Sequence, residues 1–153
     1  MPATNPFFYV QGRLKTLIQA SPYFVAVRDD QILTEQAGDL NFLVPEKILK
    51  LGFGVVITTA HGNANENQYE SLRTIEDLNI SITHRPNAAP AYNALDALWA
   101  VVMAVHGQSI ANPAPNVVTD FDLFKVVAHQ RRTDVDPALH VHELHVQGGL
   151  RLL

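Results

Sequence analysis

The twelve residues RTIEDLNISITH (73–84) decide the architecture, because apolar and polar side chains alternate along them. Leu78, Ile80 and Ile82 fall on one side of an extended chain, and the residues between them are polar. A period of two with one polar face is typical of a half-buried strand in an antiparallel sheet. The sequence therefore predicts a strand from Arg73 to His84.

The apolar run GVVITTA (54–60) is rich in β-branched residues and predicts a buried strand. Between the two strands lies HGNANENQYE (61–70), which has no apolar periodicity and contains three asparagines. We expect a long, exposed, flexible loop there. The two strands are predicted to pair around it as an antiparallel hairpin.

Two segments have helical spacing of apolar residues. FFYVQGRLKTLIQA (7–20) follows Asn5-Pro6, a favourable helix start, and ends at Ser21-Pro22. NALDALWAVVMAVHG (93–107) has apolar residues all along its length and a glycine at its end. Asp96 is almost the only charge in this second helix. We expect it to be covered on more than one side, by a sheet plus another helix or a neighbouring subunit.

The remaining segments carry weaker signals. Residues 23–27 (YFVAV) are β-prone and predict a short strand, residues 31–33 an extended edge, and residues 45–51 one or two helical turns. Residues 108–120 predict a loop rich in proline and asparagine. Strands are predicted over 121–132 and 139–146, joined by a turn at 133–137, with a bulge at His142-Glu143 that would restore one apolar face.

Together these segments predict a single α+β domain spanning residues 1–153. Its sheet is expected to be mainly antiparallel, with four to five strands, and the two principal helices are expected to pack on one face of it. The chain has 47% hydrophobic residues, which excludes a disordered chain, and no apolar run long enough to span a membrane. The first residues lack the pattern of a signal peptide, so secretion is not expected.

Charge is scarce in this sequence. Only 17% of the residues are charged, against about 25% in ordinary soluble domains. Interface cores are poor in charge because ionised groups are unfavourable to desolvate. The composition therefore fits a subunit that packs against copies of itself, with plain compositional drift as the alternative. The net charge of −4 argues against binding duplex DNA, and the absence of cysteine excludes disulfides and thiolate sites.

Three histidines, His140, His142 and His145, form the one cluster with metal-binding potential. His140 and His142 would share a face of a strand, with Glu143 or His145 completing a site. However, the spacing misses the helical zinc signature by one residue. The alternative reading is half-exposed strand histidines at a subunit contact.

Other chemistry-bearing patterns are weak. No serine lies in a nucleophile elbow and no glycine-rich phosphate loop follows a strand. The acidic pairs Asp29/Asp30, Glu76/Asp77 and Asp134/Asp136 suit turns and caps. Arg131-Arg132 is the largest basic cluster, and Trp99 and the phenylalanines are expected in the core. We therefore assign no catalytic, cofactor-binding or metal-binding residue, expect no cofactor, and expect that the chain is not an enzyme.

The order of elements resembles the tail terminator (tail completion) proteins of long-tailed phages, of the lambda minor tail protein type. The segments that carry the resemblance are the 7–20 helix, the strand LNISITHRP (78–86), the 93–107 helix, and the final hairpin VVAHQRRTDVDPALHVHELHV (126–146). It rests on layout and length, with no signature motif. Residues 28–53 depart from it, because they are longer and more helical than the simplest layout.

The resemblance implies a virion structural protein, made in the host cytoplasm and located at the head–tail junction. Such proteins form a hexameric ring that caps the tail tube and offers a surface to the head connector. The implied partners are other copies of the chain, the tail tube protein and the head connector or completion protein. Arg131 and Arg132 would face the tube end or make passing contact with DNA in the lumen. No membrane partner is implied.

Three other interpretations remain open at this stage. Within the same class, the chain could be a head-completion (connector) protein or a minor tail protein. In another class, it could be a small metal-binding protein or metal-dependent enzyme that uses His140, His142 and His145. It could also be a cytoplasmic oligomeric module that binds an unidentified ligand.

Overall fold

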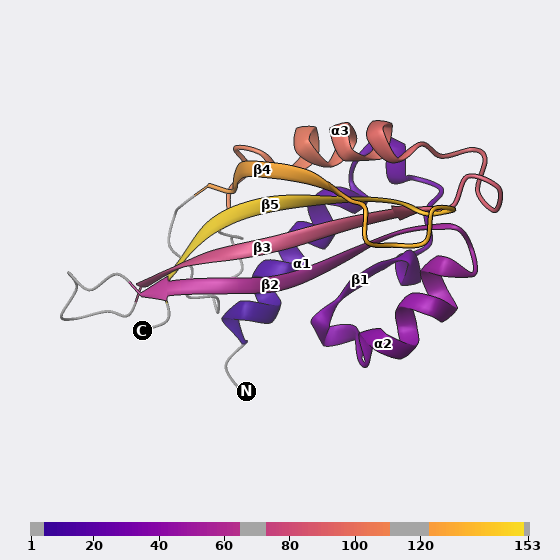
Figure 1. Ribbon diagram of the computed structural model, residues 1–153. Coiled ribbons are helices and arrows are strands. Elements are labelled where there is room, and N and C mark those ends of the chain that lie inside the picture. Colours follow the sequence, from indigo (N-terminus) through magenta and orange to yellow (C-terminus); the bar gives the residue numbers. More distant parts are fainter. Residues whose placement is uncertain (1–4, 65–72, 111–122, 152–153) are drawn as a thin grey trace.

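A single five-stranded sheet organises the protein (Figure 1). The computed structural model describes residues 5–64, 73–110 and 123–151. The strand order is β1-β2-β3-β5-β4, in which β1 and β2 are parallel and the other neighbours are antiparallel. This confirms the predicted α+β class. The main elements are α1 (Pro6–Gln19), β1 (Ile32–Thr34), α2 (Leu40–Leu43), β2 (Phe53–Ala64), β3 (Arg73–His84), α3 (Ala94–Val105), β4 (Lys125–Arg132) and β5 (His140–Arg151).

The predicted hairpin is present as β2 and β3. Val55 lies opposite Ile82 and Ile57 opposite Ile80, so their side chains share one buried face. The strand β3 has the predicted limits, whereas β2 continues through a bulge at Thr59/His61 to Ala64. Residues 61–64 are therefore strand and not loop, because they pair with the start of β3. The rest of the expected 61–70 loop lies outside the described residues, as does most of the expected 108–120 loop.

The last strand, β5, runs between β3 and β4 without interruption. Its pairing with β3 is continuous from His84↔His140 to Arg73↔Arg151, so the predicted bulge at His142-Glu143 is wrong. The apolar residues of β5 change from one face of the strand to the other at this point, because the polar residue His142 occupies a position on the helix-covered face, opposite Ile82. The irregularity lies instead in β4, between Val126 and Ala128.

Both principal helices pack on the same face of the sheet. Asn5 caps α1, because its Oδ1 accepts hydrogen bonds from the backbone N–H of Phe7 (3.0 Å) and Phe8 (3.4 Å). One core cluster joins the two helices to alternate residues of β2, β3 and β5. The buried aliphatic residues of the helices in this cluster are Val10, Leu14, Ile18, Ala97, Leu98, Val101 and Val105.

No helix in the described ranges has the length and apolar character needed to cross a membrane.

The predicted strand at 23–27 is wrong. Pro22 begins a short 3-10 helix that ends at Phe24, as suits a residue whose φ is fixed near helical values. Phe24 turns into the core, whereas Val25 is 84% exposed. The Tyr23 ring packs edge-on against Phe24 and Phe53, with ring centroids 5.3 Å and 6.4 Å apart. Aromatic packing thus replaces strand pairing in this segment.

A close contact between Ile48 and Gly54 shapes the edge of the sheet next to α2. The chain from β1 passes through α2 and a π-helical segment (Val44–Leu49) before entering β2. This confirms the predicted edge at 31–33 and the helical turns near 45–51. Ile48 packs on Gly54 so closely that a Cβ there would lie 2.5 Å from its Cγ1. Only glycine allows this contact.

Candidate assembly interface

The start of α3 is fixed by two side chains. Asn93 Oδ1 accepts hydrogen bonds from the N–H of Leu95 (2.9 Å) and Asp96 (3.2 Å), which satisfies the first free donors of the helix. The Tyr23 hydroxyl donates to Asn93 O (3.0 Å) and accepts from Asn93 N (2.9 Å). Burial raises the pKa of Tyr23, so this hydroxyl keeps its proton as a donor. The orientation of α3 is therefore well determined.

An apolar stripe runs along the outer side of α3. Leu95, Trp99 and Met103 are 61%, 64% and 63% exposed, and their spacing of four residues puts them on one face. Trp99 was expected in the core, and that prediction is wrong. Because α3 is apolar on all sides, the spacing of its apolar residues does not reveal which side packs on the sheet. Ala97 and Val101 occupy that side and are fully buried.

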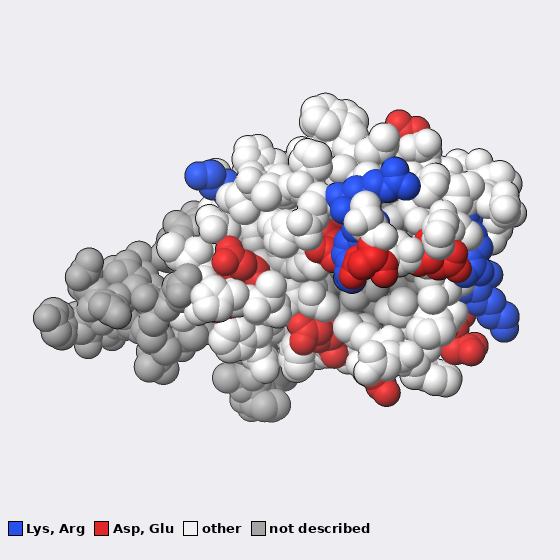
Figure 2. Space-filling view, in the orientation of Figure 1, with Lys and Arg blue, Asp and Glu red and all other residues white. Residues whose placement is uncertain are grey.

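The stripe is flanked by a hollow on each side. Between α3 and β4 lies a groove of about 390 Å³, with Leu144 contributing to its apolar lining. Between α3 and α1 lies a second hollow of about 370 Å³ that includes Leu17 and Met103. Figure 2 shows that the surface over α3 is almost entirely free of charged side chains. The α3–β4 groove is lined mainly by Leu95, Leu98, Trp99, Val102, Val126 and His129.

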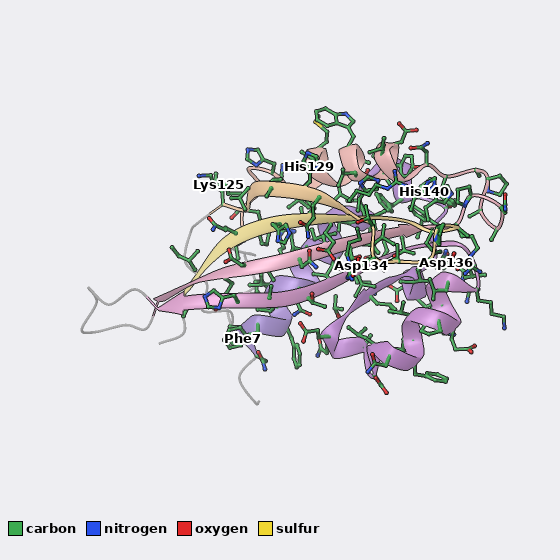
Figure 3. The ribbon with its side chains drawn as sticks, viewed as in Figure 1. Phe7, Lys125, His129, Asp134, Asp136 and His140 are labelled. Atoms are coloured by element: carbon green, nitrogen blue, oxygen red, sulfur yellow. The ribbon has the colours of Figure 1, made fainter. Side chains whose placement is uncertain are left out.

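The edge strand β4 carries basic side chains on both of its faces, and Lys125, which pairs with Gln147, lies on the face away from the groove. In Figure 3, His129 lies below α3 and Lys125 at the start of β4. Arg131 lies opposite His142, on the helix-covered face. Arg132 points to the other face, where its Nε donates to Asp134 (2.9 Å) and its Nη1 to Glu143 (3.3 Å). The two arginines therefore do not form the joint basic patch that a shared contact with DNA would use.

The three candidate histidines do not converge. His140 and His142 share the helix-covered face, as predicted for positions two apart in a strand, but His145 lies opposite Asn79 on the other face. Within the described ranges, no three His, Asp or Glu side chains are grouped so that they could hold a metal ion. Burial, followed by the charge of Arg131 and by His140 and His129, lowers the pKa of His142. The lowered pKa favours the neutral form of this imidazole.

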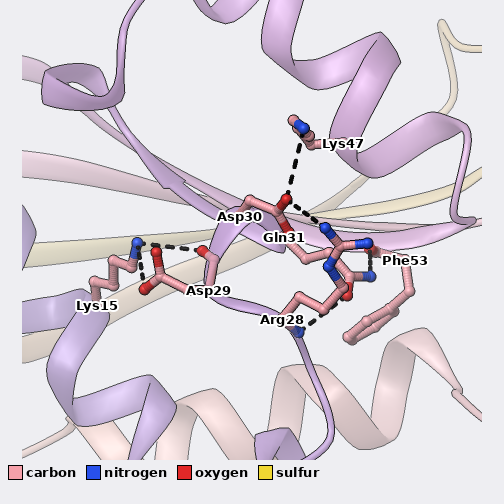
Figure 4. Close-up of polar contacts among 7 residues, drawn as sticks. All are labelled: Lys15, Arg28, Asp29, Asp30, Gln31, Lys47 and Phe53. Atoms are coloured by element: carbon pink, nitrogen blue, oxygen red, sulfur yellow. Dashed lines mark hydrogen bonds and ion pairs between the residues drawn. The ribbon is translucent and has the colours of Figure 1, made fainter.

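The acidic pair at 29–30 has a structural role. Asp29 contacts Lys15 at 3.1 Å, and Asp30 contacts Arg28 at 2.9 Å and Lys47 at 3.6 Å (Figure 4). The hydrogen bond from Lys15 is the main cause that lowers the pKa of Asp29. These contacts tie α1 and the π-helical segment to the turn before β1, in agreement with the predicted turn role.

A second exposed surface lies at the α2 edge of the sheet, opposite the β4 edge (Figure 1). We call it the α2 surface and define it by Asp39, Phe42 and Glu46. Phe42 is 64% exposed, so the expectation that the phenylalanines are core residues fails here, although Phe24, Phe53 and Phe124 are buried. Phe42 stands in the largely apolar run LNFLV (40–44), which gives no sequence signal for an exposed position.

Comparison with known proteins supports the fold. No protein-family model matches the chain, and a search of curated proteins gives no match. Among solved structures, the chain is similar to one from "Virion of native gene transfer agent (GTA) particle", with a TM-score of 0.61 and 14% identity. The likeness covers 92% of this chain and 93% of that chain. It shows that the two chains have the same fold over nearly their whole length.

Proposed function

We propose that this chain is a virion structural protein, and more narrowly a tail terminator-like subunit. In this role it forms a ring, a hexamer, that caps the tail tube and joins it to the head connector. The observation that carries the proposal is the full-length fold likeness to a chain of a gene transfer agent virion. The layout that resembles tail terminator proteins supports the narrower role.

The surface chemistry supports assembly. A ring is built from head-to-tail contacts, so each subunit needs two different adhesive surfaces. The stripe of Leu95, Trp99 and Met103 and the α2 surface are separate exposed surfaces, and the α2 surface contributes one large apolar side chain, Phe42. Monomeric proteins rarely leave large contiguous apolar patches exposed, and such patches usually mark a binding site.

The proposed partners are other copies of the chain, the tail tube protein and the head connector, and the proposed location is the head–tail junction of the particle. The role is architectural and uses no catalytic step. A head-completion protein or a minor tail protein would be built from the same kind of surfaces, so the experiment must identify which partner is bound.

The test uses polymerising tail tube protein from the same genome. We expect the purified chain to form a ring of one size in light scattering coupled to size exclusion. Added to growing tubes, it should bind one end and shorten the mean tube length seen by electron microscopy, compared with tube protein alone. Binding to the head connector without any effect on tubes would indicate a head-completion protein. A chain that stays monomeric and leaves tube length unchanged would overturn the proposal.

A further inference from the structure

We propose that the α3–β4 groove receives Phe42 from the α2 surface of a second copy of this chain. The inference rests on the proposed ring-forming role and specifies the contact that would build the ring. We define the groove surface by Leu95, Trp99, Val126 and His129, with Arg131 on β4 beside it.

Apolar complementarity is the first argument. The groove is open, has a volume of about 390 Å³, and is lined mostly by aliphatic side chains and one indole. Phe42 projects from a four-residue helix with most of its ring uncovered. Aromatic side chains that fill an apolar pocket supply most of the binding energy of many interfaces. Phe42 is the large exposed aromatic residue of the α2 edge, which makes it the natural occupant.

Charge complementarity selects a second copy as the partner. On the helix-covered face of β4, Arg131 follows the groove residue His129 by two positions, and the strand contains no acidic residue. Residues 28–50 contain three basic and five acidic residues, a net charge of −2. Within the described part of the chain, Arg131 on one side and Asp39 and Glu46 on the other make no ion pair. Opposite potentials steer the two surfaces together.

The same charges disfavour a symmetric contact. If two groove surfaces faced each other, Arg131 would be brought near its own copy, and like charges across an interface are repulsive. The groove and the α2 surface lie at opposite edges of the sheet (Figure 1). A contact between them is therefore head-to-tail, and its repetition closes into a ring or continues as a filament.

Two substitutions test the contact. Trp99→Glu alters the groove and Phe42→Glu alters the α2 surface, and both side chains are exposed, so the fold should survive. Phe7→Glu is the matched control, because Phe7 lies on α1 outside both surfaces (Figure 3). In sedimentation velocity over a concentration series, we expect each test variant to associate at least about tenfold more weakly than wild type. The control should associate normally.

Mixing the two test variants gives the decisive result. The Trp99→Glu chain still offers Phe42, and the Phe42→Glu chain still offers the groove, so the mixture should form one-to-one dimers and nothing larger. A symmetric contact through α3 would not give this outcome. Arg131→Glu should weaken assembly, and adding Glu46→Arg to the same chain should restore it. Trp99 is the single tryptophan, so its emission in wild type should shift to the blue on assembly.

The outcomes separate the two proposals. If wild type assembles and the folded Trp99→Glu and Phe42→Glu variants assemble equally well, the docking inference is overturned and the ring role stands. If the folded variants fail to assemble alone but also fail to dimerise when mixed, Phe42 does not enter the groove. If wild type remains monomeric at every concentration, with and without tube protein, the ring role itself fails, and the docking inference fails with it.

Discussion

Gln11 and Glu35 hold each other in place by two hydrogen bonds, although they are far apart in the sequence. Gln11 Nε2 donates to Glu35 Oε1 (2.9 Å), and Glu35 N donates to Gln11 Oε1 (2.9 Å). The same Gln11 amide donates to Thr59 Oγ1 (2.9 Å), and Glu35 Oε1 accepts from Thr59 N (2.7 Å). Gln11 is only 1% exposed. This network joins α1, the turn after β1, and β2.

Removing this amide should destabilise the fold. Gln11→Ala leaves the N–H of Glu35 and the Thr59 hydroxyl without their partner in a partly buried setting, and we expect a loss of about 1–3 kcal/mol of unfolding free energy. Urea denaturation measures it. Gln19→Ala is the control, because Gln19 makes one exposed hydrogen bond to Asp29. An equal effect of the two changes would contradict the structural role of Gln11.

Two glycines should respond in opposite ways to the same substitution. In Gly54→Ala, the new Cβ would lie 2.5 Å from Ile48 Cγ1 and 2.8 Å from Gln31 O, so we expect a loss of about 1–3 kcal/mol through overpacking. Gly12 lies within α1 and has nothing within 4 Å of an added Cβ. Gly12→Ala should therefore stabilise the protein by about 0.5–1 kcal/mol. Thermal melts of both variants check the sign.

Acid should weaken the fold through His142. Its folded pKa is below the ordinary 6.5, so the unfolded chain binds more protons as the pH falls below that value. The stability contributed by the neutral imidazole is complete above pH 6.5 and is lost as the pH falls through the range beneath it. Melting temperatures measured from pH 7.5 down to pH 5 should decline less steeply in His142→Leu and His142→Gln than in wild type. Parallel slopes would exclude this histidine as the cause.

The Tyr23 hydroxyl should matter more than an ordinary surface hydroxyl. Tyr23→Phe removes both hydrogen bonds to the Asn93 backbone at the start of α3. We expect a loss of about 1–2 kcal/mol in unfolding free energy. The Tyr9 hydroxyl makes one hydrogen bond of 3.2 Å to Ile110 O, so Tyr9→Phe serves as the comparison and should have a smaller effect. Equal losses would show that the position of Tyr23 is not special.

Much of the fold could be predicted from local patterns. Most of β3 follows from the alternation of apolar and polar residues over 78–83, and Asn93 and Gly107 mark the ends of α3, where Gly107 adopts φ +78°. Residues 23–27 were mispredicted because β-propensity ignores the helical start that Pro22 imposes. Local patterns therefore succeed where one periodicity dominates and fail where two signals compete.

The candidate interface was harder to predict. The sequence indicated that α3 needs cover on more than one side, but it could not identify Trp99 as the exposed residue, because every side of the helix is apolar. Nothing in the sequence indicated that Phe42 is exposed. The hydrogen-bond network of Gln11 could not be predicted either, because its partners Glu35 and Thr59 are 24 and 48 positions away in the sequence. Long-range contacts of this kind depend on the assembled sheet and not on any local pattern.

The position of β5 determines when the sheet can be completed during synthesis. It follows the other four strands of the sheet in the chain, yet it sits inside the sheet, between β3 and β4. A nascent chain that stops before His140 leaves β3 with an open edge and β4 with no neighbour. The sheet can thus be completed only after this segment has been synthesised. Chains that terminate earlier would not fold into intact subunits, so they would not compete with finished copies for assembly.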